Sequence, residues 1–491
     1  MSRRVRGPGE EPRGALASRG ILMLLVALGA PTVAAAQERP IRETLAAIEY
    51  PPLEFEQPQI EHHEVEGVPV LLLASRELPL VTVHAYFEGG YGLFGRDAYA
   101  SAMGLPALLR YGGTTDLAPD SVDRILDFYA VQTQFGSAGG AVTSTVNTLT
   151  EHLETALDIW GEMLAAPRFD SAEIAVWRGR QLESALRLRD DPGRLAFSEF
   201  NRLLFGDHPI GWQMEPDDLD PAKVTTERFA DVHGRVVCRE NLILGVTGDG
   251  EWSEVEDVIE RLVRRIAPCP AELPEPPEPD IRRGGGVHVI DRDLEQAVIV
   301  MAHPTSVRLG DTDEYFSAMI GNSILGGGGF SSRILGRVRT EEGYAYSASS
   351  LWTTPREHDG ILGAVTRTRP ENAVPAIEVI LGAMGELRTD PPTEGEVGTA
   401  VDQVVNGFVF NFETASQIVV RTMLFQAQEL PEDWLERYSR GVQAVSPESI
   451  REVFAAQLRP EEMTILIVGD PDRIGREALE GLGPVTLLEG R

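Results

Sequence analysis

The chain has 491 residues and carries 44 lysines and arginines against 76 aspartates and glutamates, which gives a formal net charge of −32 at pH 7. This length exceeds what one hydrophobic core normally serves, and 42% hydrophobic with 24% charged residues is an ordinary globular balance, so we expect two folded domains. The negative charge repels nucleic acid and anionic membranes. It excludes both as partners and favours solubility, cationic partners or peptides.

Residues 1–36 are predicted to form a signal peptide. Five arginines between Arg3 and Arg19 precede an apolar run at residues 21–30, and small residues suited to cleavage follow at residues 33–36. The apolar run is too short to be a stable membrane anchor. We therefore expect export, cleavage near Ala36, and a periplasmic or extracellular mature protein that begins with a lead-in segment at residues 37–60. The export route stays open.

Residues 61–266 are predicted to form the first domain. Within them, residues 68–90 contain two apolar, β-branched runs joined by a polar Ser-Arg-Glu turn, which is typical of two strands, and long helical stretches follow. Cys238 and Cys269 flank the last strand and helix of this domain, and an even pair in an exported protein can form a disulfide. The sequence leaves this pairing open, because it does not give the separation of the two cysteines in space.

A proline- and glycine-rich segment, residues 267–286, is predicted to link the first domain to a second one at residues 287–491. The second domain repeats the pattern of the first. Residues 287–305 again read as two strands around a polar turn, and the apolar runs LILGVTGD and ILIVGD recur at matching places in the two domains. We therefore expect two α+β domains that are built alike.

Several ordered segments resemble the pitrilysin/insulinase peptidases, the inverted zincins whose zinc helix carries His-x-x-Glu-His. In the second domain the block FSSRILGRVRTEEGYAYSASS, residues 330–350, is similar to the family's Ser-Arg helix and Arg…Gly-x-Ala-Tyr-Ser stretch. The resemblance covers nearly all of the chain after residue 60. It implies an α+β fold of two homologous insulinase-like domains, each an antiparallel-rich sheet with helices packed on it, joined by the linker into a clamshell.

The family's zinc helix is similar to residues 101–114, SAMGLPALLRYGGT, but its functional residues are replaced. The resemblance places Gly104 and Leu108 where the two histidines belong, and Ala107 where the general-base glutamate belongs. Ser184 takes the place of the third ligand. A catalytic zinc needs three imidazole, carboxylate or thiolate ligands. We therefore expect no catalytic residue at these positions and no metal or other cofactor in this chain.

The resemblance assigns substrate binding to Arg339 and Tyr346, which stand where the family has a peptide-holding arginine and tyrosine. A guanidinium can bind peptide carbonyls or a carboxylate, and a phenol hydroxyl can donate to the carbonyl oxygen under attack. The structural alternative is that Arg339 caps a helix by pairing with Glu341 or Glu342, while Tyr346 is a buried strand aromatic.

Four consecutive glycines precede this block: Gly326, Gly327, Gly328 and Gly329. A phosphate-binding P-loop needs Lys and then Ser or Thr after its glycines, whereas Phe330 and two serines follow here, so a P-loop is excluded. One interpretation is a helix C-cap with a tight turn. The resemblance to the family's non-catalytic subunits implies another, a mobile loop that contacts peptide.

These features predict the substrate-binding, non-catalytic subunit of a heterodimeric zinc metalloendopeptidase, similar to the mitochondrial processing peptidase and to bacterial two-chain members of the family. The expected partners are a zinc-bearing homologous subunit, which would hold the only zinc, and a peptide substrate. Arg339 and Tyr346 would complete the partner's active site. The alternative is a stand-alone peptide-binding or scaffold pseudo-peptidase of the cell envelope. The sequence specifies neither the substrate nor the partner, and a homodimer is also open.

Overall fold

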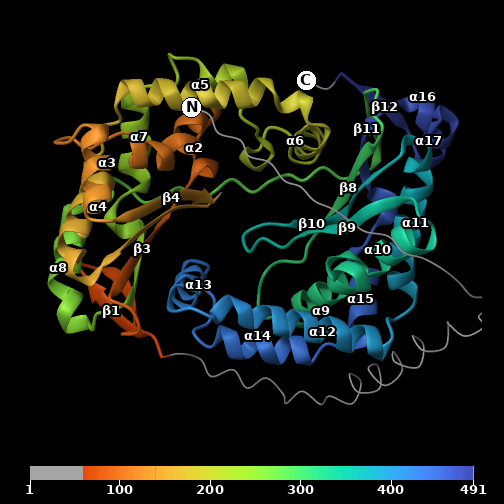
Figure 1. Cartoon of the computed structure of the whole chain (residues 1–491). Helices are drawn as coiled ribbons and strands as arrows, with labels where there is room; N and C mark the ends of the chain where they lie inside the picture. Colours follow the sequence, from red (N-terminus) through yellow and green to blue (C-terminus); the bar gives the residue numbers. More distant parts are fainter. Residues whose placement is uncertain (1–58, 139, 490–491) are drawn as a thin grey trace, which may run out of the picture. The chain divides into compact units, whose positions relative to one another are not determined.

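Two six-stranded mixed sheets organise the chain in a computed structural model, which describes residues 59–138 and 140–489 (Figure 1). The predicted signal peptide, residues 1–36, and nearly all of the lead-in segment lie outside the described residues. All described residues fall in one compact unit, residues 55–491.

The first sheet has the strand order β1-β2-β6-β3-β5-β4, and only the β2–β6 pair is parallel. Its strands are β1 (Glu61–Val65), β2 (Val68–Ala74), β3 (Leu80–Glu88), β4 (Gln132–Ala138), β5 (Ala141–Leu149) and β6 (Leu242–Gly248).

The second sheet has the order β12-β7-β11-β8-β10-β9, and β7 runs parallel to both β11 and β12. Its strands are β7 (Gly286–Asp291), β8 (Ala297–Thr305), β9 (Ala345–Thr353), β10 (Gly360–Thr368), β11 (Thr464–Gly469) and β12 (Val485–Leu488). Strands β7, β11, β8, β10 and β9 occupy the places of β2, β6, β3, β5 and β4 in the first sheet. This correspondence confirms the predicted repeat and the α+β fold of two similar halves.

Helices surround each sheet. Those of the first half are α2 (Arg96–Tyr111), α3 (Pro119–Phe128), α4 (Leu153–Ala165), α5 (Ser171–Leu186), α6 (Pro192–Phe205), α7 (Thr226–Val236) and α8 (Trp252–Arg265). Those of the second half are α9 (Asp313–Asn322), α10 (Arg333–Leu335), α11 (Ala373–Thr389), α12 (Glu394–Val409), α13 (Ala415–Ala427), α14 (Trp434–Gln443), α15 (Pro447–Gln457), α16 (Pro471–Ile474) and α17 (Arg476–Leu482).

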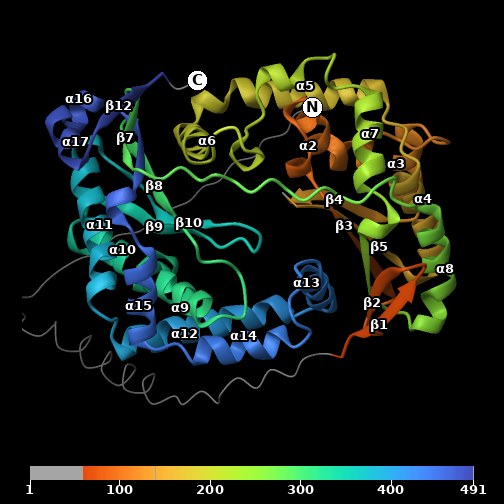
Figure 2. The ribbon, with the colours of Figure 1, turned by 180° about the vertical axis from the view of Figure 1, so that it is seen from behind.

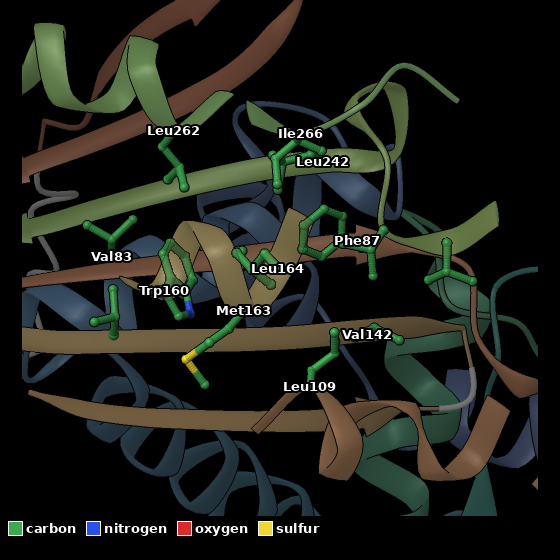
Figure 3. Close-up of a cluster of buried hydrophobic side chains, with 14 of the residues drawn as sticks. Val83, Phe87, Leu109, Val142, Trp160, Met163, Leu164, Leu242, Leu262 and Ile266 are labelled. Atoms are coloured by element: carbon green, nitrogen blue, oxygen red, sulfur yellow. The ribbon is translucent and has the colours of Figure 1, made fainter. Parts of the chain in front are cut away.

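The first core lies between one face of the first sheet and the helices α2, α4 and α8 (Figure 3). On β3 the alternate residues Val81, Val83, Ala85 and Phe87 point into this core, as the two-residue period of a strand requires. The indole of Trp160 on α4 is fully buried there, and its N–H donates to the hydroxyl of Ser144 at 2.8 Å. The only polar atom of this large side chain is therefore satisfied inside the core.

The opposite face of each sheet is covered by a helix from the other half. Helix α13 packs on β2 and β6, where Val419 and Met423 contact Leu71 (Figure 2). Helix α6 packs on β8 and β11, where Phe200 and Leu195 join the strand residues of the second sheet. The exchange of helices explains why β8 is buried along its whole length, because both of its faces are covered.

The segment at residues 267–285 contains no helix or strand and runs along the first half before β7 begins at Gly286. The backbone N–H of Arg282 donates to the carbonyl of Leu204 at 2.9 Å, which ties the end of this segment to α6. None of the described helices combines the length and the apolar character that a bilayer crossing demands.

Candidate functional site

Three of the four positions where the family carries its zinc site, those of Gly104, Ala107 and Leu108, lie on α2. The residues there pack against neighbouring side chains. Leu108 is only 1% exposed and belongs to the first core, and Gly104 is buried on the same side of the helix. A Cβ atom added to Gly104 would lie 2.6 Å from Cζ2 of Trp177 on α5. The Trp177 indole therefore fills the space above Gly104, where the resemblance expected a histidine.

Ser184, at the place of the third ligand, lies near the end of α5 and is half-buried. Its hydroxyl accepts a hydrogen bond from the guanidinium of Arg194 at 3.1 Å. The residues at the four positions thus offer one hydroxyl, one methyl, one isobutyl group and one glycine, which do not fit zinc. Within residues 59–138 and 140–489, no group of three or more His, Cys, Asp or Glu side chains could hold a metal ion.

In the second half, the structure brings Arg339 and Tyr346 together. The guanidinium carbon of Arg339 lies 4.4 Å from the ring centre of Tyr346 and 4.9 Å from that of Phe330. Both rings are 78% exposed. The arginine comes from the π-helical turn η9 (Gly336–Glu341), a local form that is frequent at functional sites. An exposed aromatic clamp thus holds the guanidinium at the surface by cation–π contacts.

A β-bulge explains why Tyr346 points outward. In the β9–β10 pair, Ser347 faces Arg367 and Ala345 faces Thr368, so Tyr346 lies between them without a partner. A residue inserted in this way bends its strand and re-aims its side chain. The hydroxyl of Thr368 donates to the carbonyl of Tyr344 at 2.6 Å and helps to fix the bulge.

The structural alternative for this pair is wrong for Tyr346, because the ring is exposed. For Arg339, no carboxylate among the described residues, including Glu341 and Glu342, lies within ion-pair distance. The geometry leaves the guanidinium and the phenol free to meet a ligand. Their role in substrate binding itself stays a prediction.

A shallow cavity of about 290 Å³ opens beside this pair. Arg367 at the end of β10 and Arg369 just beyond it contribute two more guanidinium groups to its lining, and no lining residue is acidic. Sequence reasoning missed these two arginines. Their spacing of two residues in a strand was a readable signal, because it places both on one face.

The four glycines divide into two parts. Gly326 is buried against β9, where a Cβ atom would collide with the backbone nitrogen of Ser350. Gly329 has a φ of 62°, a conformation that suits glycine in a turn, and it precedes Phe330, whose ring lies under Arg339. The run is therefore a tight turn that delivers Phe330 to the clamp. Whether it contacts peptide stays a prediction.

The Ser-Arg part of the same block has a structural contact. Arg333 at the start of α10 makes a bidentate ion pair with Glu396 of α12, at 2.7 and 3.0 Å. The hydrogen bonds from Arg333 lower the pKa of Glu396 to about 2. This pair fixes the helix that follows the glycine turn.

Cys238 and Cys269 form a disulfide in the structure, with their Cα atoms 4.9 Å apart. The bond joins the segment before β6 to the start of the proline-rich stretch. The sequence left this pairing open, and the structure shows that the two cysteines are bonded.

Comparisons with known proteins point to one family. Residues 223–404 match the family described as the peptidase M16 inactive domain. Over this segment the chain is similar to M16 domains. The resemblance to the insulinase-type peptidases is thereby confirmed, although the zinc-motif positions at residues 104–108 lie outside the matched M16 segment. The side chains on α2 therefore carry the conclusion about zinc.

The named relatives that this chain resembles include both a zinc protease and a non-peptidase homolog. An uncharacterized zinc protease of Streptomyces coelicolor is 26% identical over 315 residues, which cover 62% of this chain and 67% of that protein. The non-peptidase homolog YmxG of Helicobacter pylori is 21% identical over 84% of this chain and 94% of its own length. With none of the family's zinc ligands at positions 104, 108 and 184, this chain resembles the second kind, an inactive M16 homologue.

Solved structures agree on the fold. A peptidase M16 inactive domain from Pseudomonas fluorescens superposes with a TM-score of 0.74 at 22% identity, covering 84% of this chain and 98% of that one. A protease from Helicobacter pylori gives a TM-score of 0.73 at 15% identity, with 84% and 100% coverage. At these identities the likeness concerns the M16 fold alone.

Proposed function

We propose that this chain is the substrate-binding, non-catalytic subunit of a heterodimeric zinc metalloendopeptidase. The observation that carries the proposal is the clamp of Arg339 and Tyr346, exposed on a bulge and free of carboxylates, in a chain whose own zinc positions are filled by Trp177 and core residues. A zinc-bearing M16 homologue is the proposed partner. Its zinc would supply the Lewis acid that this chain lacks.

The contribution of this chain to the reaction is to bind and orient the peptide. The guanidinium of Arg339 donates to a peptide carbonyl through its planar N–H groups. The phenol of Tyr346 donates to the carbonyl oxygen on which negative charge develops, and such preorganised donors stabilise a transition state. The aromatic contacts to Tyr346 and Phe330 keep the arginine in place before the peptide arrives.

The test is a pair of substitutions in the purified complex with the zinc-bearing homologue. Arg339→Ala and Tyr346→Phe should each lower kcat/KM for a quenched fluorescent peptide by about 10²-fold, the usual effect of losing one such donor. Tyr346→Phe removes only the hydroxyl, so the ring contact to Arg339 remains. Arg440→Ala, at an exposed arginine on α14, is the control. Full activity in both clamp variants would refute this division of labour.

Export is part of the same proposal. The disulfide between Cys238 and Cys269 supports it, because such bonds persist in oxidising compartments. Mass spectrometry of the protein recovered from its native host should find an N-terminus at Gln37. Recovery of the chain with Met1 still attached would count against export.

A second candidate function is a stand-alone peptide-binding or scaffold protein of the cell envelope. The same clamp favours it, because an exposed arginine without a carboxylate can hold a peptide without any hydrolysis. The two candidates differ in one respect: only the heterodimer gains peptidase activity when the zinc-bearing homologue is added.

A further inference from the structure

Three arginines line the cavity beside Tyr346. Arg339 comes from η9, Arg367 from β10 and Arg369 from the residue that follows this strand. The remaining lining is neutral, with Gln296 and Tyr344 among it. In a chain with a formal net charge of −32, this cavity is a local concentration of positive charge.

The strand geometry presents Arg367 and Arg369 on one side. Both are exposed, whereas Thr366, Thr368 and Pro370 between and around them are buried. The hydroxyl of Thr366 donates to the carbonyl of Ser347 in β9 at 2.8 Å, and that of Thr368 donates to the carbonyl of Tyr344, just before β9, at 2.6 Å. The buried threonines therefore anchor the backbone that carries the two arginines.

The three arginines lack acidic partners. Among the described residues, none of them makes an ion pair or a side-chain hydrogen bond, while nearby Arg333 and Arg337 are bound by Glu396 and Glu386. Like charges that line one cavity favour the binding of an anion there, because the anion offsets their mutual repulsion.

The two carboxylates nearest to this cluster are engaged elsewhere. Asp191 accepts the backbone N–H groups of Gly193 and Arg194 at 2.8 and 3.1 Å, and these bonds, with Arg367, lower its pKa. Glu371 accepts from Arg473 at 3.1 and 3.2 Å. Asp191 also interacts electrostatically with Arg367, and Glu371 with Arg369, but neither carboxylate makes an ion pair with these arginines or lines the cavity.

Gly193 makes room for Arg367. A Cβ atom at this position, in the first turn of α6, would collide with the guanidinium of Arg367. Arg367 also lines the neighbouring cavity of about 340 Å³, together with Asp191 and Gly193. The guanidinium is thus positioned by a helix that packs on the second sheet.

We propose that Arg339, Arg367 and Arg369 form a recognition pocket for a carboxylate of the bound peptide. The planar fork of a guanidinium matches a carboxylate in bidentate fashion, and about 290 Å³ suits a carboxylate and its adjoining atoms. That the ligand is a peptide rests on the proposed function. The carboxylate comes either from the peptide's C-terminus or from an Asp or Glu side chain.

The test measures binding by the mature chain alone, residues 37–491, with fluorescence anisotropy. Three labelled peptides have the same sequence of uncharged residues except at one central position. The first has a central Gln and a free C-terminus, the second has a central Glu and an amidated C-terminus, and the third, the neutral peptide, has a central Gln and an amidated C-terminus. The wild-type chain should prefer one carboxylate peptide over the neutral one by about tenfold or more. The preferred peptide identifies the source of the carboxylate.

Substitutions then assign the preference to the pocket. Arg367→Gln with Arg369→Gln should abolish the preference for the carboxylate peptide over the neutral one. Gly193→Ala should weaken the preference by displacing Arg367 without removing a charge. Arg228→Gln, at an exposed arginine on α7, is the matched control and should change nothing.

Two outcomes overturn the inference. If all three peptides bind equally, or if the Arg367 and Arg369 variants keep the preference, the pocket does not select carboxylates. The peptide-binding role in the proposed function would then remain. If no peptide binds at all, the peptide-holding role in the proposed function fails as well. Carboxylate-dependent binding without activity on mixing with the zinc-bearing homologue supports the pocket and rejects the heterodimer.

Discussion

At position 104, the indole of Trp177 occupies the space that a side chain would need. Trp177 of α5 lies over Gly104, and its ring also contacts Phe229 edge-on at 5.9 Å. The absence of a Cβ atom is therefore used for close packing between α2 and α5. A larger residue at position 104, such as the histidine of the zinc motif, would therefore clash with Trp177.

We predict that Gly104→Ala destabilises the protein by about 1–3 kcal/mol, because even one methyl group overpacks this contact. Urea unfolding of the purified chain measures the change. Trp177→Ala in the same chain should remove most of the additional cost of Gly104→Ala. Gly179 lies on α5, the helix of Trp177, and has open space around an added Cβ atom. Gly179→Ala should therefore be neutral or slightly stabilising. Equal effects at positions 104 and 179 would contradict the packing account.

At this scale the sequence predicted the replaced motif and the block containing Arg339 and Tyr346. It could not predict that Trp177 fills the site, because α2 and α5 meet only through the tertiary fold. Arg367 and Arg369 were missed for a similar reason. Their approach to Arg339 depends on the β9–β10 register and on the bulge at Tyr346.

At the scale of elements, the exchanged helices define how each sheet is covered. The sequence predicted two strands in residues 68–90 and two in residues 287–305, and the structure confirms them as β2 and β3 and as β7 and β8. It did not predict that β6 lies between the first two in the sheet and β11 between the second two. It did not predict that α6 and α13 cross to the sheet of the other half. An amphipathic pattern marks the apolar face of a helix but does not specify which sheet receives it.

His84 lies on the face of β3 that α13 covers. Its side chain is buried, its Nδ1 lies 3.2 Å from the hydroxyl of Thr145, and its Nε2 has no partner among the described residues. Burial lowers the pKa of His84 from 6.5 to about 4. The neutral ring is thus retained in the folded state over a pH range where the unfolded chain binds a proton.

This shift predicts a specific pH dependence. Because the folded pKa is below the unfolded one, the unfolded state gains protons first, and His84 costs stability as pH falls from about 6.5 to about 4. The loss should reach about 3 kcal/mol. Denaturant unfolding of the wild type and of His84→Gln at pH 7 and pH 4 isolates this contribution. Parallel losses in the two proteins would show that His84 does not titrate as its burial implies.

At the scale of the whole molecule, the chain combines an M16 fold with a site that suits binding and not metal chemistry. Both halves repeat one sheet topology, and the second presents Arg339, Arg367 and Arg369 around one cavity beside the bulge of the edge strand β9. Against the overall negative charge, this cationic surface is the place where we propose that an anionic segment of a peptide binds. The first half supplies α6, which positions Arg367.

The most direct measurement is the zinc content and peptidase activity of the mature chain, alone and after mixing with the proposed partner, a zinc-bearing M16 homologue from the same host. Mass spectrometry of bound metals and a quenched fluorescent peptide provide the two readouts. The account predicts no stoichiometric zinc and no cleavage for the chain alone, with cleavage that rises above that of the homologue alone when the two are mixed. Stoichiometric zinc together with cleavage by the single chain would contradict it.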